Sequence, residues 1–256
     1  MSLIMMLAVR DKFVATTSDS MLSVQSHLKA NETVGIKRGV GNTESSKTIQ
    51  LNKNVLLGIG GIVITGDEVF PELITSVEEA DYLEDVARKL EKILIEKYEN
   101  RLEHTPFNIK LDKKRTSLSF IGTKHFGCYL TGFLKNGNTA VACWDYETMK
   151  VVITESTIHP VLIIFSSNEQ DSTDFTSWFN FGEDTEASES DYIQQLLLVH
   201  GVISFKEAET VSSDCTVQYL DKSKNFNEIK QDTSILYEVL DQAEDFSYET
   251  VSSLLI

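Results

Sequence analysis

The first apolar positions of the chain fall into two short runs. Residues 4–9 are uninterruptedly apolar, residues 10–12 are a polar Arg-Asp-Lys turn, and β-branched residues dominate 13–17. Two runs of this length joined by a short polar turn predict a β-hairpin. Asp19 stands where the second strand of this hairpin is expected to end.

A second pair of strands is predicted after a long polar connection at 20–46. Residues 47–51, Lys-Thr-Ile-Gln-Leu, alternate in polarity, residues 52–54 are a polar turn, and residues 55–59 are an apolar run that ends at Gly60-Gly61. Alternation and short apolar runs bounded by glycines are both typical of strands. We therefore expect a glycine turn directly after the second of these strands.

Two helices are expected next, at about 65–76 and 80–102. The second has the stronger pattern, because its apolar residues recur on one helical face while charged residues such as Glu84 and Arg88 occupy the other. Its apolar face consists of Leu83, Val86, Leu90, Ile93, Leu94 and Leu102. This amphipathic pattern indicates a helix that packs against the rest of the fold.

Strand patterns return between 116 and 166. Asn136-Gly137 is the strongest short hairpin signal in the chain. With these two residues as the turn, Cys128 and Cys143 are expected on one face of the hairpin as packed core thiols. The strands are expected at 117–121, 127–134, 139–144, 150–154 and 161–165.

The last third of the chain is predicted to contain an acidic segment, helices and one strand. After an acidic, Ser- and Thr-rich segment at 168–190, a helix is expected at about 191–200, and the capping-box spacing Ser204-Phe-Lys-Glu207 predicts the start of another. A strand is expected at 216–220. Periodic apolar residues from Ile235 to Leu240 predict a closing helix.

The order of these elements indicates the fold class. Helix pairs on either side of a mostly antiparallel block of strands predict an α+β protein built as a four-layer α/β/β/α sandwich, not a doubly wound sheet. A chain of 256 residues is long enough to bury a full core, and no internal repeat divides it. We expect a single domain over 1–256 with a C-terminal helical tail at about 231–256.

Composition excludes several kinds of partner. A net charge of −16 argues against nucleic-acid backbones and anionic membrane surfaces, which both require clustered Lys and Arg. Three cysteines and five histidines have no metal-ligand spacing, so neither a disulfide framework nor a metal site is expected. We expect no cofactor, no nucleic-acid partner and no membrane partner, and a reducing cytoplasm fits the cysteines best.

The N-terminal residues do not have the pattern of a targeting segment. There is no basic leader and no small-residue cleavage site, and only about six apolar residues precede Arg10. No run approaches the roughly 20 apolar residues of a membrane helix. A soluble protein is therefore expected.

Four stretches together resemble the proteasome-type branch of the N-terminal nucleophile hydrolases, which includes the proteasome β-subunits and the bacterial peptidase that works under an unfoldase ring. They are Val14-Ala-Thr-Thr-Ser-Asp19, Lys47-Thr-Ile-Gln-Leu, the run from Val55 to Gly61 before the acidic Asp67, and Glu209-Thr-Val-Ser-Ser213. They are similar to the family's second strand, its Lys-x-x-x-Leu strand, its strand–Gly–helix passage and its Asp-x-x-Ser-Gly motif. Their order over residues 4–220 carries the resemblance.

The resemblance implies a hydrolase in which an N-terminal Thr, Ser or Cys attacks an amide carbonyl, with the free α-amine as general base. Lys47 would be the buried cation that favours the neutral amine, and Asp19 would pair with it and orient it. Ser212 and Glu209 would form hydrogen bonds around the amine. The turn at Gly60 and Gly61 would donate backbone N–H groups to an oxyanion.

The N-terminus departs from the family's pattern. Alignment of the first strand, with a turn one residue shorter, places Ile4 at the position of the nucleophile, and an isoleucine cannot attack a carbonyl. Glu209 also replaces the expected Asp, and Ser213 replaces the expected Gly. Ser2 is the alternative nucleophile, provided that removal of Met1 exposes it.

Three functions stay open on these grounds. The first, which we favour, is a non-catalytic or repurposed subunit for assembly or binding, with a homo-oligomer as its form. The second is an active N-terminal serine hydrolase that cleaves peptide or other amide bonds through Ser2, Lys47 and Asp19. The third is a small-molecule-binding sandwich without a link to proteolysis.

Overall fold

The computed structural model describes residues 3–20, 47–61, 63–104, 126–145, 148, 150–165, 175–179, 187–208 and 211–254. These residues form two five-stranded sheets with the strand orders β10-β9-β2-β1-β8 and β3-β4-β5-β6-β7. Every pairing of neighbouring strands in both sheets is antiparallel. The predicted α+β class with mostly antiparallel sheets therefore agrees with the structure.

The first sheet contains β1 (Ile4–Val9), β2 (Phe13–Asp19), β8 (Val161–Phe165), β9 (Asp214–Leu220) and β10 (Phe226–Asp232). The second contains β3 (Thr48–Asn52), β4 (Val55–Gly61), β5 (Phe126–Phe133), β6 (Thr139–Asp145) and β7 (Lys150–Glu155). The helices are α1 (Val63–Ser76), α2 (Leu83–His104), η2 (Phe175–Phe179), α4 (Glu189–Lys206), η3 (Thr233–Leu236), α5 (Tyr237–Leu240) and α6 (Tyr248–Leu254).

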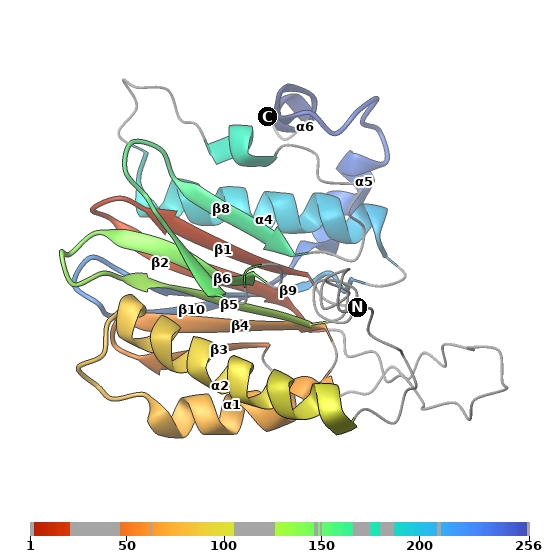
Figure 1. Cartoon of the computed structure of the whole chain (residues 1–256). Helices are drawn as coiled ribbons and strands as arrows, with labels where there is room; N and C mark the ends of the chain where they lie inside the picture. Colours follow the sequence, from red (N-terminus) through yellow and green to blue (C-terminus); the bar gives the residue numbers. More distant parts are fainter. Residues whose placement is uncertain are drawn as a thin grey trace, which may run out of the picture.

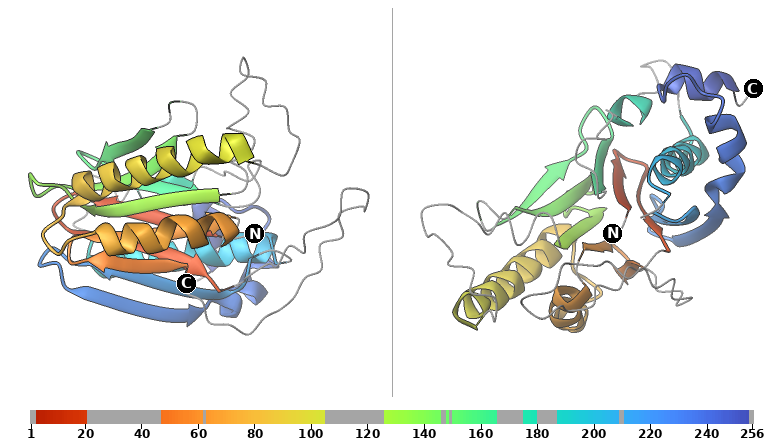
Figure 2. Two further views of the ribbon diagram at one scale, coloured as in Figure 1. Left: turned by 60° about the horizontal axis from the view of Figure 1, so that its bottom comes forward. Right: turned by 90° about the vertical axis from the view of Figure 1, so that its right-hand side faces the viewer.

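The two sheets face each other, with helices on their outer sides (Figure 1). Helices α1 and α2 lie against the sheet that contains β4, and α4 lies against the sheet that contains β1. The views in Figure 2 show the same arrangement from two other directions, with the C-terminal α6 beyond α4. The expected helices at 65–76 and 80–102 correspond to α1 and α2.

Strand β1 is buried on both faces, which explains its uninterrupted apolar sequence. Side chains alternate along a strand, so its residues divide between two packing layers. Met5 and Leu7 belong to the core between this sheet and α4, whereas Ile4 and Met6 belong to the core between the two sheets. Strand β1 is thus held in the middle of the molecule.

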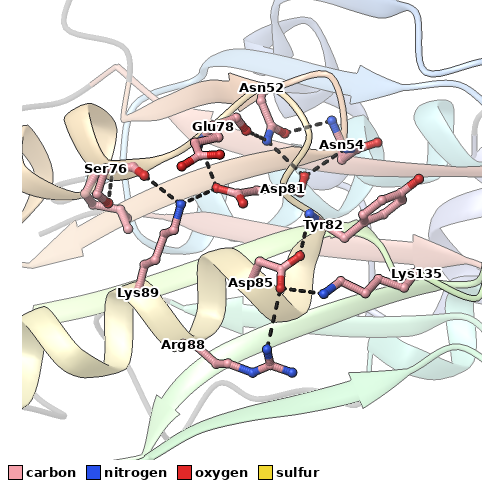
Figure 3. A network of polar contacts seen from close by, with 11 residues as sticks. Asn52, Asn54, Ser76, Glu78, Asp81, Tyr82, Asp85, Arg88, Lys89 and Lys135 are labelled. Atoms are coloured by element: carbon pink, nitrogen blue, oxygen red, sulfur yellow. Dashed lines mark hydrogen bonds and ion pairs between the residues drawn. The ribbon is translucent and has the colours of Figure 1, made fainter.

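A polar network fixes the loop between α1 and α2 to the β3–β4 turn (Figure 3). The Asn52 amide donates to the carbonyls of Glu78 and Asp81 at 2.7 and 3.0 Å, and the Asn54 amide donates to the Asp81 carbonyl at 2.8 Å. Lys89 of α2 donates to the Asp81 carboxylate at 2.5 Å. These bonds set the position at which α2 begins to cross the sheet.

Helix α4 differs from the prediction of two helices. It begins at a capping box formed by Ser188 and Asp191 and continues without a break to Lys206. Ser204, predicted to cap a second helix, lies inside α4, where its hydroxyl donates to the Gly201 carbonyl at 3.1 Å. The prediction was wrong because a buried serine within a helix can bond back to the preceding turn instead of capping a new one.

The β5–β6 hairpin has a different register from the predicted one. Phe133 pairs with Thr139 and Tyr129 pairs with Cys143, so the loop spans 134–138. A shift of register by one residue moves side chains to the opposite face of a sheet. Cys128 therefore packs against α1 and α2, whereas Cys143 faces the other side, and the two thiols do not share a face as predicted.

The C-terminal part also differs from the predicted single closing helix. Residues 226–232 form β10, which pairs with β9 along its whole length, and the following residues form the short η3 and α5. The polar alternation of β10 is typical of an edge strand with one face in solvent. The predicted strand at 117–121 lies outside the described residues. No helix in the described part of the chain is long and apolar enough to span a membrane.

Candidate functional site

The structure brings Lys47 and Asp19 together at one end of the first sheet. Lys47 Nζ lies 2.6 Å from Asp19 Oδ1, and the two side chains are 5% and 0% exposed. Asp19 is the last residue of β2, and Lys47 directly precedes β3. The Lys47 carbonyl accepts the N–H of Ile59 at 2.8 Å, which anchors the lysine backbone to β4. The ion pair thus joins the two sheets.

Leu3 is the residue whose backbone contacts this pair. Its N–H donates to Asp19 Oδ1 at 2.8 Å, and its carbonyl accepts the N–H of Asp19 at 3.3 Å. The register that pairs Ile4 with Ser18 produces this contact. Ile4, which alignment placed at the nucleophile position, instead points into the core between the sheets.

Burial controls the ionisation of the groups around the pair. Desolvation lowers the pKa of Lys47, and the charge and hydrogen bond of Asp19 oppose that shift. Cys215 pairs with Asp19 across β2 and β9, and burial together with the Asp19 charge raises the pKa of its thiol. Burial and the Lys47 charge lower the pKa of His200 to about 3. Cys215 is therefore a neutral thiol and His200 a neutral imidazole near pH 7.

Ser212 lies beside the pair in a small hydrogen-bonded cluster. Its Oγ is 2.9 Å from the Oγ of Ser20, the residue that follows Asp19, and it accepts the N–H of Asp214 at 3.1 Å. The Ser20 hydroxyl is also 3.2 Å from a carboxylate oxygen of Asp214. This cluster joins the end of β2 to the start of β9.

Gly60 and Gly61 are strand residues, so the predicted glycine turn is wrong. They are the last residues of β4 and pair with Gly127 and Phe126 of β5. The strand continues through the glycines because β5 extends far enough to pair with them. Since the Ile59 N–H points toward Lys47, strand alternation directs the Gly61 N–H to the same side.

Ser2 and Glu209 lie outside the described residues. Of the other predicted site residues, the structure groups Asp19, Lys47 and Ser212 at one end of the first sheet. Sequence reasoning missed Leu3 and His200. The signal for His200 was its position within the apolar run Leu-Leu-Leu-Val-His-Gly-Val-Ile, where a polar residue has to be buried if the helix is buried.

The described residues contain no group of three or more His, Cys, Asp or Glu side chains that could hold a metal ion. Cys128, Cys143 and Cys215 are free thiols. The site described above consists of a buried ion pair, two serines and backbone amide groups.

Comparison with known proteins yields a likeness of fold. No family model matches the sequence, and no curated protein matches it. Among solved structures, a Gly-1 mutant of Anbu from Hyphomicrobium sp. strain MC1 superimposes with a TM-score of 0.56 at 8% sequence identity, covering 100% of this chain and 94% of that chain. Anbu is a proteasome-like protein related to the N-terminal nucleophile hydrolases. At this identity, the likeness concerns the fold alone.

Proposed function

We propose that the chain is a proteasome-like subunit that uses the N-terminal nucleophile hydrolase fold for assembly or binding and not for amide hydrolysis. The likeness to Anbu over the full length supports the fold. Two facing antiparallel sheets with α1 and α2 outside one and α4 outside the other support the four-layer α/β/β/α arrangement (Figure 1). The same likeness supports a single domain over 1–256 that includes the C-terminal tail from about residue 231.

This proposal rests on which residue contacts the Lys47–Asp19 ion pair at the start of β1. N-terminal nucleophile chemistry requires a hydroxyl or thiol and a free amine beside the buried lysine. Among the described residues, the backbone group that donates to the Asp19 carboxylate beside Lys47 is the peptide N–H of Leu3, which is not basic, and the Leu3 side chain is apolar and 0% exposed. Neither group can attack a carbonyl or accept a proton from an attacking group.

In a non-catalytic subunit of this kind, the Lys47–Asp19 ion pair has a structural role. Asp19 Oδ1 accepts hydrogen bonds from both Lys47 and Leu3, so one buried carboxylate holds the start of β1, the end of β2 and the start of β3 together. Charge-assisted hydrogen bonds of this kind are among the stronger ones in proteins. Residues that resemble those of a catalytic site would thereby be retained because they hold the three strand ends together.

An active serine hydrolase is the second candidate. It is favoured by one observation, namely that Ser2 is bonded directly to the residue whose N–H lies 2.8 Å from Asp19. If removal of Met1 exposes Ser2, the lowered pKa of Lys47 suits a lysine that assists a neutral amine. Gly61, with its N–H on the side of Lys47, would then be the oxyanion donor. Gly60, Ser212 and Glu209 are further candidates for its site.

Intact mass and amide turnover separate the two candidates. We expect that natively expressed protein shows no turnover of peptide or aryl-amide substrates above the level of the Ser2→Ala and Lys47→Ala variants. A mass that corresponds to a chain beginning at Ser2, together with amide turnover that both substitutions abolish, would establish the hydrolase. It would refute the proposed structural role of the ion pair. A retained Met1 excludes the hydrolase outright.

Light scattering tests the subunit part of the proposal. A proteasome-like subunit is expected to form a closed homo-oligomer, because symmetric closure satisfies every interface. A strictly monomeric protein at tens of micromolar would count against assembly as its role.

With a net charge of −16 and free cysteines, we place the protein in a reducing cytoplasm without nucleic-acid or membrane partners.

A further inference from the structure

His200 is a fully buried residue of α4 whose imidazole contacts the C-terminal segment. Its side chain is 0% exposed, and its Nδ1 lies 3.2 Å from the hydroxyl of Thr233, the first residue of η3. Its other ring nitrogen, Nε2, is buried and has no hydrogen-bond partner among the described residues. Buried polar atoms are nearly always satisfied by protein or by ordered water, so Nε2 requires an explanation.

The bonds around Thr233 determine the tautomer of this imidazole. The Thr233 hydroxyl carries one proton, which it donates to the Ser213 carbonyl at 2.9 Å. Its oxygen can therefore only accept from His200, so Nδ1 carries the ring proton. With the imidazole neutral, Nε2 presents a bare lone pair to its surroundings and needs a donor.

Lys47 and Thr17 are two polar residues close to the core between the first sheet and α4, alongside Asp19 and Cys215. The Lys47 charge acts directly on the His200 ring. Thr17 lies opposite Met5 and Val217, which both belong to the core shared with α4, so the Thr17 side chain points toward α4. Its hydroxyl is likewise buried without a hydrogen-bond partner in the described part of the chain.

We propose that one internal water molecule occupies the space between α4 and the Asp19 end of β2. It donates to Nε2 of His200, accepts from Nζ of Lys47 and shares its remaining proton with the hydroxyl of Thr17. A buried water usually makes about three hydrogen bonds. Two of these would go to buried atoms that have no partner among the described residues, His200 Nε2 and the Thr17 hydroxyl. Among the described residues, Lys47 Nζ donates to Asp19 and makes no direct bond to Nε2 of His200.

The water completes a chain of hydrogen bonds from the N-terminal hairpin to the C-terminal segment. It runs from Asp19 through Lys47, the water and His200 to Thr233 and the Ser213 carbonyl. Removal of either end is therefore expected to loosen the other. This inference is independent of the proposed function, since it concerns only how the buried pair and the imidazole are solvated.

Nitrogen-15 NMR of the folded wild-type protein tests the tautomer and the bound water together. We expect the His200 ring to show protonated Nδ1 and bare Nε2, with a persistent cross-relaxation peak between its carbon-bound protons and water. A ring protonated on Nε2, or the absence of that peak, overturns the proposal.

Two neighbouring threonines provide matched variants. Thr17→Val removes the hydroxyl proposed to bind the water, whereas Thr16→Val removes a buried hydroxyl on the opposite face of the same strand. We expect Thr17→Val to shift the His200 Nε2 resonance and weaken its water peak, Thr17→Ser to restore both, and Thr16→Val to change neither. Equal spectra for Thr17→Val and wild type would refute the site. The number of internal water molecules, measured by magnetic relaxation dispersion of water, is also expected to fall by one in His200→Phe.

Discussion

Lys47 and Asp19 form an ion pair from which solvent is almost entirely excluded. Removing two charges from water is costly, and the attraction between them offsets this cost only while both partners are present. The Leu3 N–H contributes a further hydrogen bond to the carboxylate. Removal of one member of the pair is therefore expected to lower the stability of the fold strongly, because the other charge is then left buried without a partner.

We predict that Lys47→Met lowers the free energy of unfolding by about 3–5 kcal/mol, the usual loss when one partner of a buried pair is removed. Lys135→Met is the control, because Lys135 pairs with Asp85 at 2.6 Å but is 53% exposed. For such an exposed pair we expect a loss below about 1 kcal/mol. Urea denaturation followed by circular dichroism measures both, and similar losses for the two variants would contradict a stabilising role of the buried pair.

His200 makes stability depend on pH. Its pKa falls from 6.5 to about 3 on folding, so the unfolded chain binds the proton over this interval and the folded chain does not. Stability is therefore complete above pH 6.5 and is lost as the pH falls toward 3, by up to about 1.4 kcal/mol per pH unit. We predict that His200→Phe reduces this slope by one proton. Unfolding curves between pH 7 and 4 measure the difference, and parallel slopes would show that His200 is not buried in its neutral form.

At the scale of elements, two glycines mark where the packed segments approach most closely. A Cβ on Gly132 of β5 would lie 2.4 Å from the Asn54 carbonyl oxygen, which belongs to backbone. A Cβ on Gly201 of α4 would lie 2.6 Å from Cδ1 of Leu236, the end of a flexible side chain in η3. The first approach is rigid, whereas the second can relax by a rotation of the leucine.

We predict that alanine at these two positions changes the stability of the protein to different extents. Gly132→Ala is expected to destabilise the protein by about 1–3 kcal/mol, because the β3–β4 turn has to move to admit the methyl group. Gly201→Ala is expected to be nearly neutral, since about 1 kcal/mol of improved helix propensity offsets the shift of Leu236. Thermal unfolding of both variants decides the matter, and a larger loss for Gly201→Ala would mean that η3 is held rigidly against α4.

At the scale of the whole molecule, charge opposes self-association. Each copy carries a net charge of −16, so two copies repel each other before any interface forms. Salt screens this repulsion over about 8 Å at physiological ionic strength. Assembly of the proposed subunit is therefore expected to depend on salt.

We predict that the oligomeric fraction rises when the salt concentration is raised from about 0.01 to 0.5 M, as screening of like charges requires. Sedimentation velocity at fixed protein concentration measures the fraction. A fall with added salt would indicate an interface held by ion pairs between copies. Sodium sulfate and sodium chloride compared at equal ionic strength control for effects of sulfate on apolar burial.

Local patterns in the sequence determined much of the secondary structure. The apolar run in β1, the turn at 10–12, the alternation in β3 and the amphipathic face of α2 each depend on neighbouring residues, and the structure has these elements where they were expected. Lys47 and Asp19 were also identified from local motifs, and the structure places them in contact. Whether the pair is structural, as we propose, or catalytic is not decided by the contact, because contact alone does not establish chemistry.

Only the tertiary structure decided register and burial, because both depend on residues distant in sequence. The pairing of β4 with β5 made Gly60 and Gly61 strand residues, and the register of the first hairpin brought Leu3, not Ile4, to Asp19. The packing of α4 against its neighbours buried His200, and burial together with the Lys47 charge keeps its imidazole neutral near pH 7. A single-residue shift in pairing changes which side chain faces a site, and no local pattern encodes that choice.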